Sequence, residues 1–139
     1  MQLTIHTDGG SRGNPGNAGG GVVVLQDGRE IFANSFGFGK KTNNEAEYLA
    51  VVEALKWLKK FSAKQLPTRV DFFLDSKLVA EQLSKNWRIK ELRLKPLASQ
   101  CWKIIGALPY SISFNHIKRE NNVLADLLAN QAMDAAEQA

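Results

Sequence analysis

Hydrophobic and polar positions along the first third of the chain follow the two-residue period of strands. Residues 2–8 (QLTIHTD) place Leu3 and Ile5 on one face and His6 and Asp8 on the other. Further on, a β-branched run precedes the dipeptide at positions 27–28 (Asp-Gly), and an alternating run follows it. Asp-Gly between two such runs is a strong hairpin signal. The first 39 residues therefore predict three antiparallel strands.

The remaining residues predict four helices and two more strands. The predicted helices cover residues 43–61, 77–86, 94–108 and 121–139, and the predicted strands cover residues 69–76 and 110–117. Pro96 is tolerated near the first turn of the third helix, and Asn122 is a suitable cap for the fourth. The order βββαβααβα implies an α/β fold, a mixed sheet with helices packed on it.

The composition is that of one soluble globular domain. The chain has 139 residues, of which 44% are hydrophobic and 23% charged, so a single domain over residues 1–139 is expected. The single cysteine, Cys101, cannot form an internal disulfide, so a cytoplasmic location is expected. The N-terminus shows no signal-peptide pattern, and no apolar run approaches the ~20 residues that span a bilayer. We expect a monomer with no membrane partner.

Positive charge is concentrated in one stretch of the sequence. The formal net charge is +4, and residues 77–103 hold seven basic but only two acidic side chains. Trp87 and Trp102 lie among them. A solvated helix face over core tryptophans explains this pattern, and so does a surface for a polyanion such as a nucleic acid.

The stretch HTDGGSRGNPG (residues 6–16) has more glycine than a turn requires. It places four glycines within the nine residues that begin at Asp8, whereas a hairpin needs one or two. An acidic side chain therefore stands at the start of an unusually open backbone segment.

Three other acids occupy positions that call for an explanation. Glu47 lies four residues before Val51, on the apolar stripe of its helix, so its carboxylate is expected to be buried and to need a partner. Asp75 ends a strand, and Asp126 lies one turn into the last helix. Taken singly, each acid has an ordinary explanation. Glu47 could take part in a salt bridge, Asp75 could cap a helix, and Asp126 is favourably placed near a helix N-terminus.

Taken together, the four acids predict a metal site. Asp8 and Asp75 are expected to close two strands, and Glu47 and Asp126 to lie early on helices that pack near strand ends. Like charges a few Å apart cannot all ionise without cations. Oxygen ligands favour hard divalent ions, and the lack of a Cys/His cluster argues against zinc. Two Mg²⁺ ions roughly 3.5–4 Å apart would clamp the attacking and leaving oxygens of a phosphodiester.

Four segments, in order, resemble the active-site segments of type 1 ribonuclease H: TDGGSRGNPGNAGGG, TNNEAEY, FLDSKLV and HIKRENNVLAD. The resemblance implies the ribonuclease H-like fold, a five-stranded mixed sheet with helices on both faces. It implies an endonuclease that cleaves the RNA strand of RNA–DNA hybrids and leaves 5′-phosphate and 3′-hydroxyl ends. It assigns Asp8, Glu47, Asp75 and Asp126 as ligands of two Mg²⁺ ions, with Mn²⁺ as a possible substitute.

The resemblance also implies which residues contact the hybrid. In the family, the glycine-rich segment approaches the minor groove, where backbone amides and short side chains contact RNA 2′-hydroxyls and so distinguish RNA from DNA. The residues that match such positions are Gly9, Gly10, Gly13, Asn14, Asn43 and Asn44. In the basic stretch, Trp87 is expected to pack on a deoxyribose of the DNA strand. Lys77 stands where many members have a glutamine, so a charge contact is expected to replace a minor-groove contact there.

Two segments depart from the better-known bacterial members. His116 matches the family's mobile histidine, but its loop (NHIKRENNV) is short and lacks glycine. Arg119 is therefore a candidate to share its role, since a guanidinium binds phosphate bidentately. The segment SKNWRIKELRLKP stands where many members carry a long lysine-rich protrusion, so this is a short form. His6 is expected to be structural. A relaxed nuclease that also cuts double-stranded RNA and a silent hybrid-binding module are the alternatives.

Overall fold

The computed structural model describes residues 2–61 and 69–138, and its elements follow the predicted order. The strands are β1 (Gln2–Arg12), β2 (Gly16–Gln26), β3 (Arg29–Lys41), β4 (Arg69–Leu74) and β5 (Ser111–His116). The helices are α1 (Asn43–Lys60), α2 (Lys77–Leu83), α3 (Lys95–Gly106) and α4 (Val123–Gln138), with a short 3₁₀ helix, η1 (Arg119–Asn121), before α4. The predicted end of the last helix, residue 139, lies outside the described residues.

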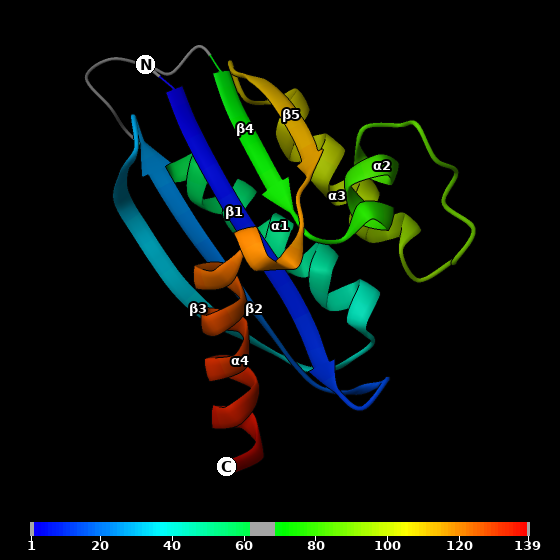
Figure 1. The fold of residues 1–139 in the computed structure, drawn as a ribbon. Coiled ribbons are helices and arrows are strands. Elements are labelled where there is room, and N and C mark those ends of the chain that lie inside the picture. The colour runs from blue at the N-terminus through cyan, green and yellow to red at the C-terminus, as the bar shows by residue number, and fades with distance from the viewer. Residues whose placement is uncertain (1, 62–68, 139) are drawn as a thin grey trace.

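The five strands form one mixed sheet in the order β3-β2-β1-β4-β5. β1, β2 and β3 are antiparallel, whereas β4 is parallel to both β1 and β5. Helix α4 crosses one face of the sheet, and α1 lies on the opposite face with α2 and α3 beside it (Figure 1). The predicted five-stranded mixed sheet with helices on both faces is confirmed.

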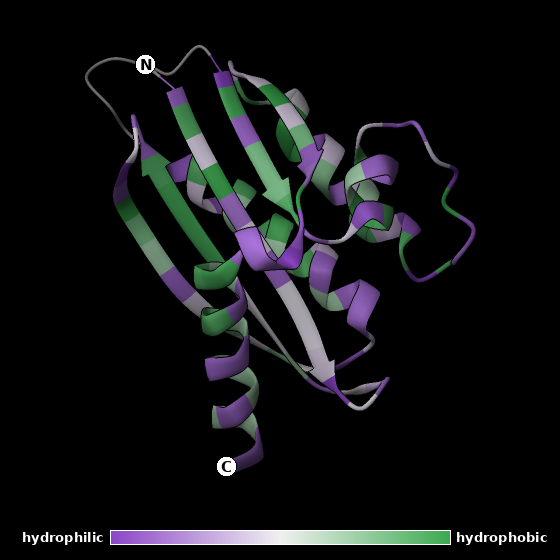
Figure 2. Cartoon of the chain, in the orientation of Figure 1, coloured by the Kyte–Doolittle hydropathy of each residue, from purple (hydrophilic) through white to green (hydrophobic). Residues whose placement is uncertain are grey.

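The core lies between the sheet and α1. Apolar side chains of the central strands meet the apolar stripe of α1, and Figure 2 shows the hydrophobic colour along β2 and β4. Fully buried members include Leu3, Ile5, Val22, Val24, Leu55 and Phe72. No helix in the described parts of the chain is long and apolar enough to cross a membrane.

Residues 9–12 of the glycine-rich segment are strand rather than loop, which corrects the expectation that Asp8 closes a strand. β1 continues past Asp8 to Arg12, and Asp8 faces Gly21 of β2 in the antiparallel register. The glycines make room for helices on both faces. A Cβ atom at Gly9 would lie 2.3 Å from the Ala46 carbonyl of α1, and one at Gly21 would lie 2.3 Å from the Ala125 carbonyl oxygen of α4.

Helix α2 is shorter than the predicted range 77–86. Ser76 caps it, since the hydroxyl accepts a hydrogen bond from the Val79 N–H. The helix ends at Leu83, and Lys85 then adopts a left-handed backbone with φ of 64°, which no α-helix continues through. Residues 84–94 therefore form a basic loop between α2 and α3, hereafter the basic loop.

Candidate active site

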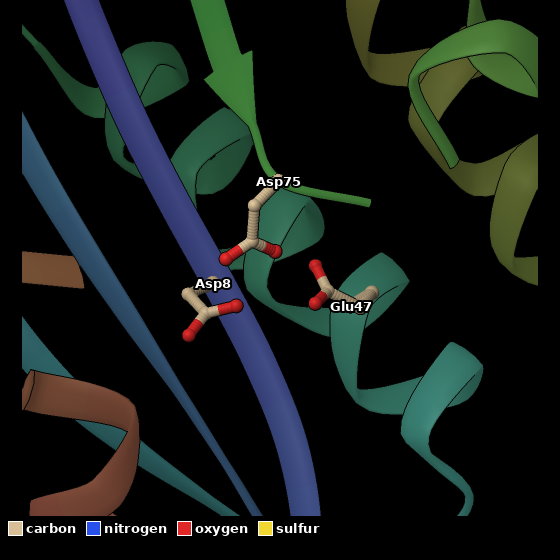
Figure 3. A group of neighbouring side chains, drawn as sticks. All are labelled: Asp8, Glu47 and Asp75. Carbon is tan, nitrogen blue, oxygen red and sulfur yellow. The ribbon is translucent and has the colours of Figure 1, made fainter. Parts of the chain in front are cut away.

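Three carboxylates, one on β1, one on α1 and one directly after β4, converge beside the middle of β1 (Figure 3). One oxygen each from Asp8, Glu47 and Asp75 lies within 4.8 Å of the other two. Thr7 of β1 is in register with Leu74 of the parallel strand β4, so Asp8 and Asp75 follow at the same level. The parallel pairing thus brings together two acids that are far apart in the sequence.

Gly9 allows Glu47 to join the other two acids. The start of α1 packs so closely on β1 that a Cβ at Gly9 would also lie 2.5 Å from the Glu47 backbone nitrogen. Thr42 and Glu45 fix this end of α1 in a capping box, in which each side chain accepts from the other's backbone N–H. The sequence-based choice of Glu47 over Glu45 agrees with this geometry, because Glu45 is engaged in the cap.

The cluster is buried and incompletely hydrogen-bonded. Asp8 is only 3% exposed and Glu47 only 7%. Asp8 Oδ1, Glu47 Oε2 and Asp75 Oδ2 are buried oxygens without a hydrogen-bond partner among the described residues. Carboxylate oxygens that converge from three acids match the ligand set that hard divalent cations take, so the residues present fit a Mg²⁺ or Mn²⁺ site.

The electrostatics of the cluster favour a bound cation. Burial, reinforced by the neighbouring Asp75 charge, raises the pKa of Asp8 to about 8. Burial, followed by the Asp8 charge, also raises the pKa of Glu47 well above its ordinary value. The carboxylates repel one another, and positive charge among them would reverse the effect.

Asp126 approaches the cluster from the other face of the sheet. It lies in the first turn of α4, and its carboxyl is close enough to Asp8 to contribute to the raised pKa of that group. It is not among the three acids whose oxygens lie within 4.8 Å of one another. The amide of Asn130 donates to the Asp126 carboxylate at 3.3 Å.

His116 and Arg119 lie beside the acids. His116 ends β5, is exposed, and stands in register with Leu74, the residue before Asp75. Arg119 belongs to η1, its side chain is 80% exposed, and its Nε lies 3.9 Å from Asp75 Oδ2. This distance is an ion pair but too long for a hydrogen bond.

The residues expected at the minor groove tie the β1–β2 hairpin to α1. Asn14 Oδ1 accepts from the Asn43 N–H at 3.0 Å, and Asn43 Oδ1 accepts from the Ser11 N–H at 2.9 Å. Gly13 turns the hairpin with φ of 95°. Asn44, the next residue of α1, is half-buried. The hairpin and the N-terminus of α1 therefore form one continuous surface next to Asp8 and Glu47.

The other residues expected at the hybrid stand on α2 and the basic loop. The Lys77 ammonium lies 5.7 Å from the ring centroid of Trp87, and Trp87 is 43% exposed. Trp87 also lines a hollow of about 500 Å³, together with Gln82 of α2 and Arg88 of the basic loop. The buried Gln82 accepts from Tyr48 Oη at 2.7 Å and donates to the Arg88 carbonyl, which anchors the loop to α1.

Sequence reasoning did not identify the residues that hold α4 to β1. Asn122, predicted as a cap, donates from its side chain to the Thr7 carbonyl at 2.8 Å. Its Oδ1 lies 3.2 Å from Nδ1 of His6, which in turn stacks on Phe73, in agreement with a structural role for His6. The i, i+4 spacing of Asp126 and Asn130 was a usable signal, since such pairs meet on a helix.

Comparisons with known proteins agree with this architecture. The family described as "Reverse transcriptase-like" matches residues 6–132. A bifunctional protein of Mycobacterium tuberculosis is 41% identical over 99% of this chain, which spans 37% of that protein's length. A Ribonuclease H of Ralstonia nicotianae is 31% identical, with 100% of this chain and 96% of that protein covered.

A solved structure extends the agreement to three dimensions. LC11-RNase H1, isolated from compost and solved in complex with an RNA/DNA hybrid, superposes with a TM-score of 0.91. The two are 38% identical in sequence, and the match covers 96% of this chain and 98% of that one. With this fold, this acidic cluster and a Ribonuclease H matched over nearly its whole length, the chain belongs to the ribonuclease H family.

Proposed function

We propose that the protein is a metal-dependent endonuclease that hydrolyses the RNA strand of RNA–DNA hybrids, leaving 5′-phosphate and 3′-hydroxyl ends. The convergence of three buried carboxylates with unpartnered oxygens carries the proposal, because a fold gains nothing from such a cluster without cations. The hybrid held by LC11-RNase H1 favours the same substrate class for this chain.

Four residues would hold two Mg²⁺ ions, for which Mn²⁺ is a substitute. Asp8 lies beside Glu47 and Asp75 and is also approached by Asp126, so it is the ligand best placed to be shared. When bound, the ions supply an activated water and stabilise the departing 3′-oxygen. Asp8 and Glu47 would hold the ions in place, because both side chains are buried on regular elements, β1 and α1.

His116 and Arg119 complete the catalytic group in this proposal. Both lie at the exposed margin of the acids, where the scissile phosphate would enter. The Arg119 guanidinium is suited to contact a phosphate oxygen, and the His116 imidazole to carry a proton or to assist product release.

The hybrid would lie across the hairpin and the N-terminus of α1. Gly9, Gly10, Gly13, Asn14, Asn43 and Asn44 would contact the RNA strand through backbone amides and short side chains. Trp87 would pack on a sugar of the DNA strand, and Lys77 would replace a minor-groove contact of the family with a charge contact to the hybrid. Charge contacts of this kind weaken as salt rises.

A cleavage assay tests the function. Labelled RNA–DNA hybrid is incubated beside matched double-stranded RNA and DNA with Mg²⁺, Mn²⁺ or EDTA. We expect metal-dependent cutting of RNA in the hybrid, no cutting by Asp8→Asn, and normal cutting by Asp27→Asn. Asp27 is a matched control, since it is an exposed turn residue at φ of 49°, which Asn tolerates.

The same assay separates the alternatives. Cutting of double-stranded RNA as well would make the protein a relaxed nuclease, which the short basic loop favours because fewer contacts remain to select the DNA strand. Binding of the hybrid without any cutting would make it a binding module. Near-normal activity of Asp8→Asn would contradict the metal-ligand assignment. The cytoplasmic location and the monomeric state stay predictions.

A further inference from the structure

Asp126 is supported differently from the other three acids. Asp8 lies on β1, Asp75 directly follows the paired strand β4, and Glu47 lies on the capped start of α1, whereas Asp126 comes from α4 on the opposite face from α1. Its neighbour one turn later, Asn130, donates from Nδ2 to the Asp126 carbonyl at 2.9 Å and to Asp126 Oδ1 at 3.3 Å. A single amide group thus contacts both the backbone and the carboxylate of Asp126.

The orientation of that amide is set by Arg12, the last residue of β1. Arg12 Nη2 donates to Asn130 Oδ1 at 3.0 Å. A guanidinium has no acceptor, so the amide oxygen must face Arg12 and the NH₂ group must face Asp126. Arg12 is held in turn by Asp134 at 2.8 Å and Glu137 at 3.3 Å, both on α4.

We propose that Asn130 is a positioning residue for Asp126, locked in its donor orientation by Arg12, so that Asp126 Oδ1 is hydrogen-bonded and Oδ2 is presented to a divalent cation shared with Asp8. The inference rests on the proposed function, since it assigns support to one ligand of that metal site. Neither Arg12 nor Asn130 touches substrate or metal in this arrangement.

The physical reason is that a metal ligand must be held in place before the cation arrives. A half-buried carboxylate such as that of Asp126 has several rotamers open to it when no neighbour holds it, and ordering it costs free energy on binding. Outer hydrogen-bond partners of metal ligands typically change metal affinity by about 10–100-fold when removed. The contact length of 3.3 Å places the expected effect at the lower end of that range.

Asn130→Ala tests the inference, with Gln131→Ala as the matched control. Gln131 is the next residue of α4, is exposed and loses the same kind of amide. Binding of Mn²⁺ is measured by calorimetry, together with thermal unfolding without metal and the Mg²⁺ concentration that gives half-maximal cleavage. In Asn130→Ala we expect about 10-fold weaker Mn²⁺ binding and a matching rise in the Mg²⁺ requirement. The KM for hybrid at saturating Mg²⁺ and the metal-free melting temperature should match the control.

Arg12→Met tests whether Arg12 acts on Asp126 only through Asn130. Alone, it is expected to weaken Mn²⁺ binding by a smaller factor than Asn130→Ala. Added to Asn130→Ala, it should weaken binding no further, because Arg12 acts only through the amide. An equal loss in both backgrounds would overturn the assignment of Arg12.

The outcomes distinguish this inference from the proposed function. If the wild type cleaves hybrid while Asn130→Ala binds Mn²⁺ and responds to Mg²⁺ like Gln131→Ala, the positioning role is wrong and the function stands. If no variant cleaves hybrid but Asn130→Ala binds Mn²⁺ about 10-fold more weakly, the function is wrong and the positioning role stands. A lower metal-free melting temperature in Asn130→Ala, with unchanged Mn²⁺ affinity, would make Asn130 purely structural.

Discussion

Asp8, Glu47 and Asp75 each bury an oxygen that no described residue satisfies. An unpaired buried polar group costs a protein on the order of 1–3 kcal/mol, and a charged one more. The exposed neighbours of the acids are different in kind. Arg119 is 80% exposed and reaches Asp75 only at 3.9 Å, so it contributes little to folding and is free to meet a ligand.

We predict that Arg119→Ala lowers the single-turnover rate of hybrid cleavage by about 10-fold or more, because a charge-assisted contact to the phosphate is lost. Its free energy of unfolding should change by less than about 1 kcal/mol, since the ion pair is exposed. His116→Ala, measured in parallel, shows whether the imidazole shares the role. Full activity in both variants would remove both residues from the catalytic group.

At the scale of elements, the close packing of α1 and α4 on the sheet determines where the acids of the site lie. Gly9 lets α1 approach β1, and Gly21 lets α4 approach β2. Because α1 carries Glu47 and α4 carries Asp126, a shift of either helix moves an acid. Gly9 and Gly21 therefore have a packing role inside the protein, besides any contact with a nucleic acid.

Gly21→Ala is predicted to destabilise the protein by about 1–3 kcal/mol, the usual cost of overpacking. The added Cβ would lie 2.3 Å from the Ala125 carbonyl oxygen and 2.7 Å from Leu128 Cβ. Gly37→Ala is the matched control, because it lies on β3 with no atom within 4 Å of its Cβ. Urea unfolding compares the two. Equal stability in both variants would show that α4 adjusts without cost.

The elements, and the positions of Glu47 and Asp75 within them, were predictable from local patterns. Helical spacing placed Glu47 on the buried face of α1, and strand patterns placed Asp75 next to α2. The strand character of residues 9–12 was not predictable. The glycines are needed because α1 and α4 pack closely on the sheet, and both helices lie later in the sequence. The contact of Arg12 with Asn130 depends on the hairpin reaching α4, and no local signal reports it.

For the whole molecule, the site exists only when the chain is folded. Residues 8, 47, 75 and 126 lie on or beside β1, α1, β4 and α4, and parallel pairing with packing on both faces brings them together. Cations that bind this arrangement bind the folded state alone, so their binding free energy adds to folding stability. Without cations, the same arrangement concentrates negative charge.

The metal-free protein is therefore predicted to lose stability as pH rises from about 7 to about 8. Burial raises the folded pKa of Asp8 from 3.8 to about 8, so in this window the folded state keeps a proton that the unfolded chain has released. Each such proton lowers the free energy of unfolding by up to about 1.4 kcal/mol per pH unit. His6, whose pKa burial lowers from 6.5, opposes this trend only weakly, because the unfolded chain has already lost most of that proton at pH 7.

Urea unfolding in EDTA at the two pH values measures this loss, with Asp8→Asn and Asp27→Asn beside the wild type. Asp27→Asn should follow the wild type, whereas Asp8→Asn should be more stable than the wild type at pH 8 and show a flatter profile. Mg²⁺ should restore stability to the wild type at pH 8, because the cation binds the ionised acids, and should restore little to Asp8→Asn. If the free energy of unfolding of the wild type neither falls between pH 7 and pH 8 nor rises with Mg²⁺, the carboxylates do not repel one another as proposed. The metal site would then have to form only when the nucleic acid brings its own phosphate to the cations.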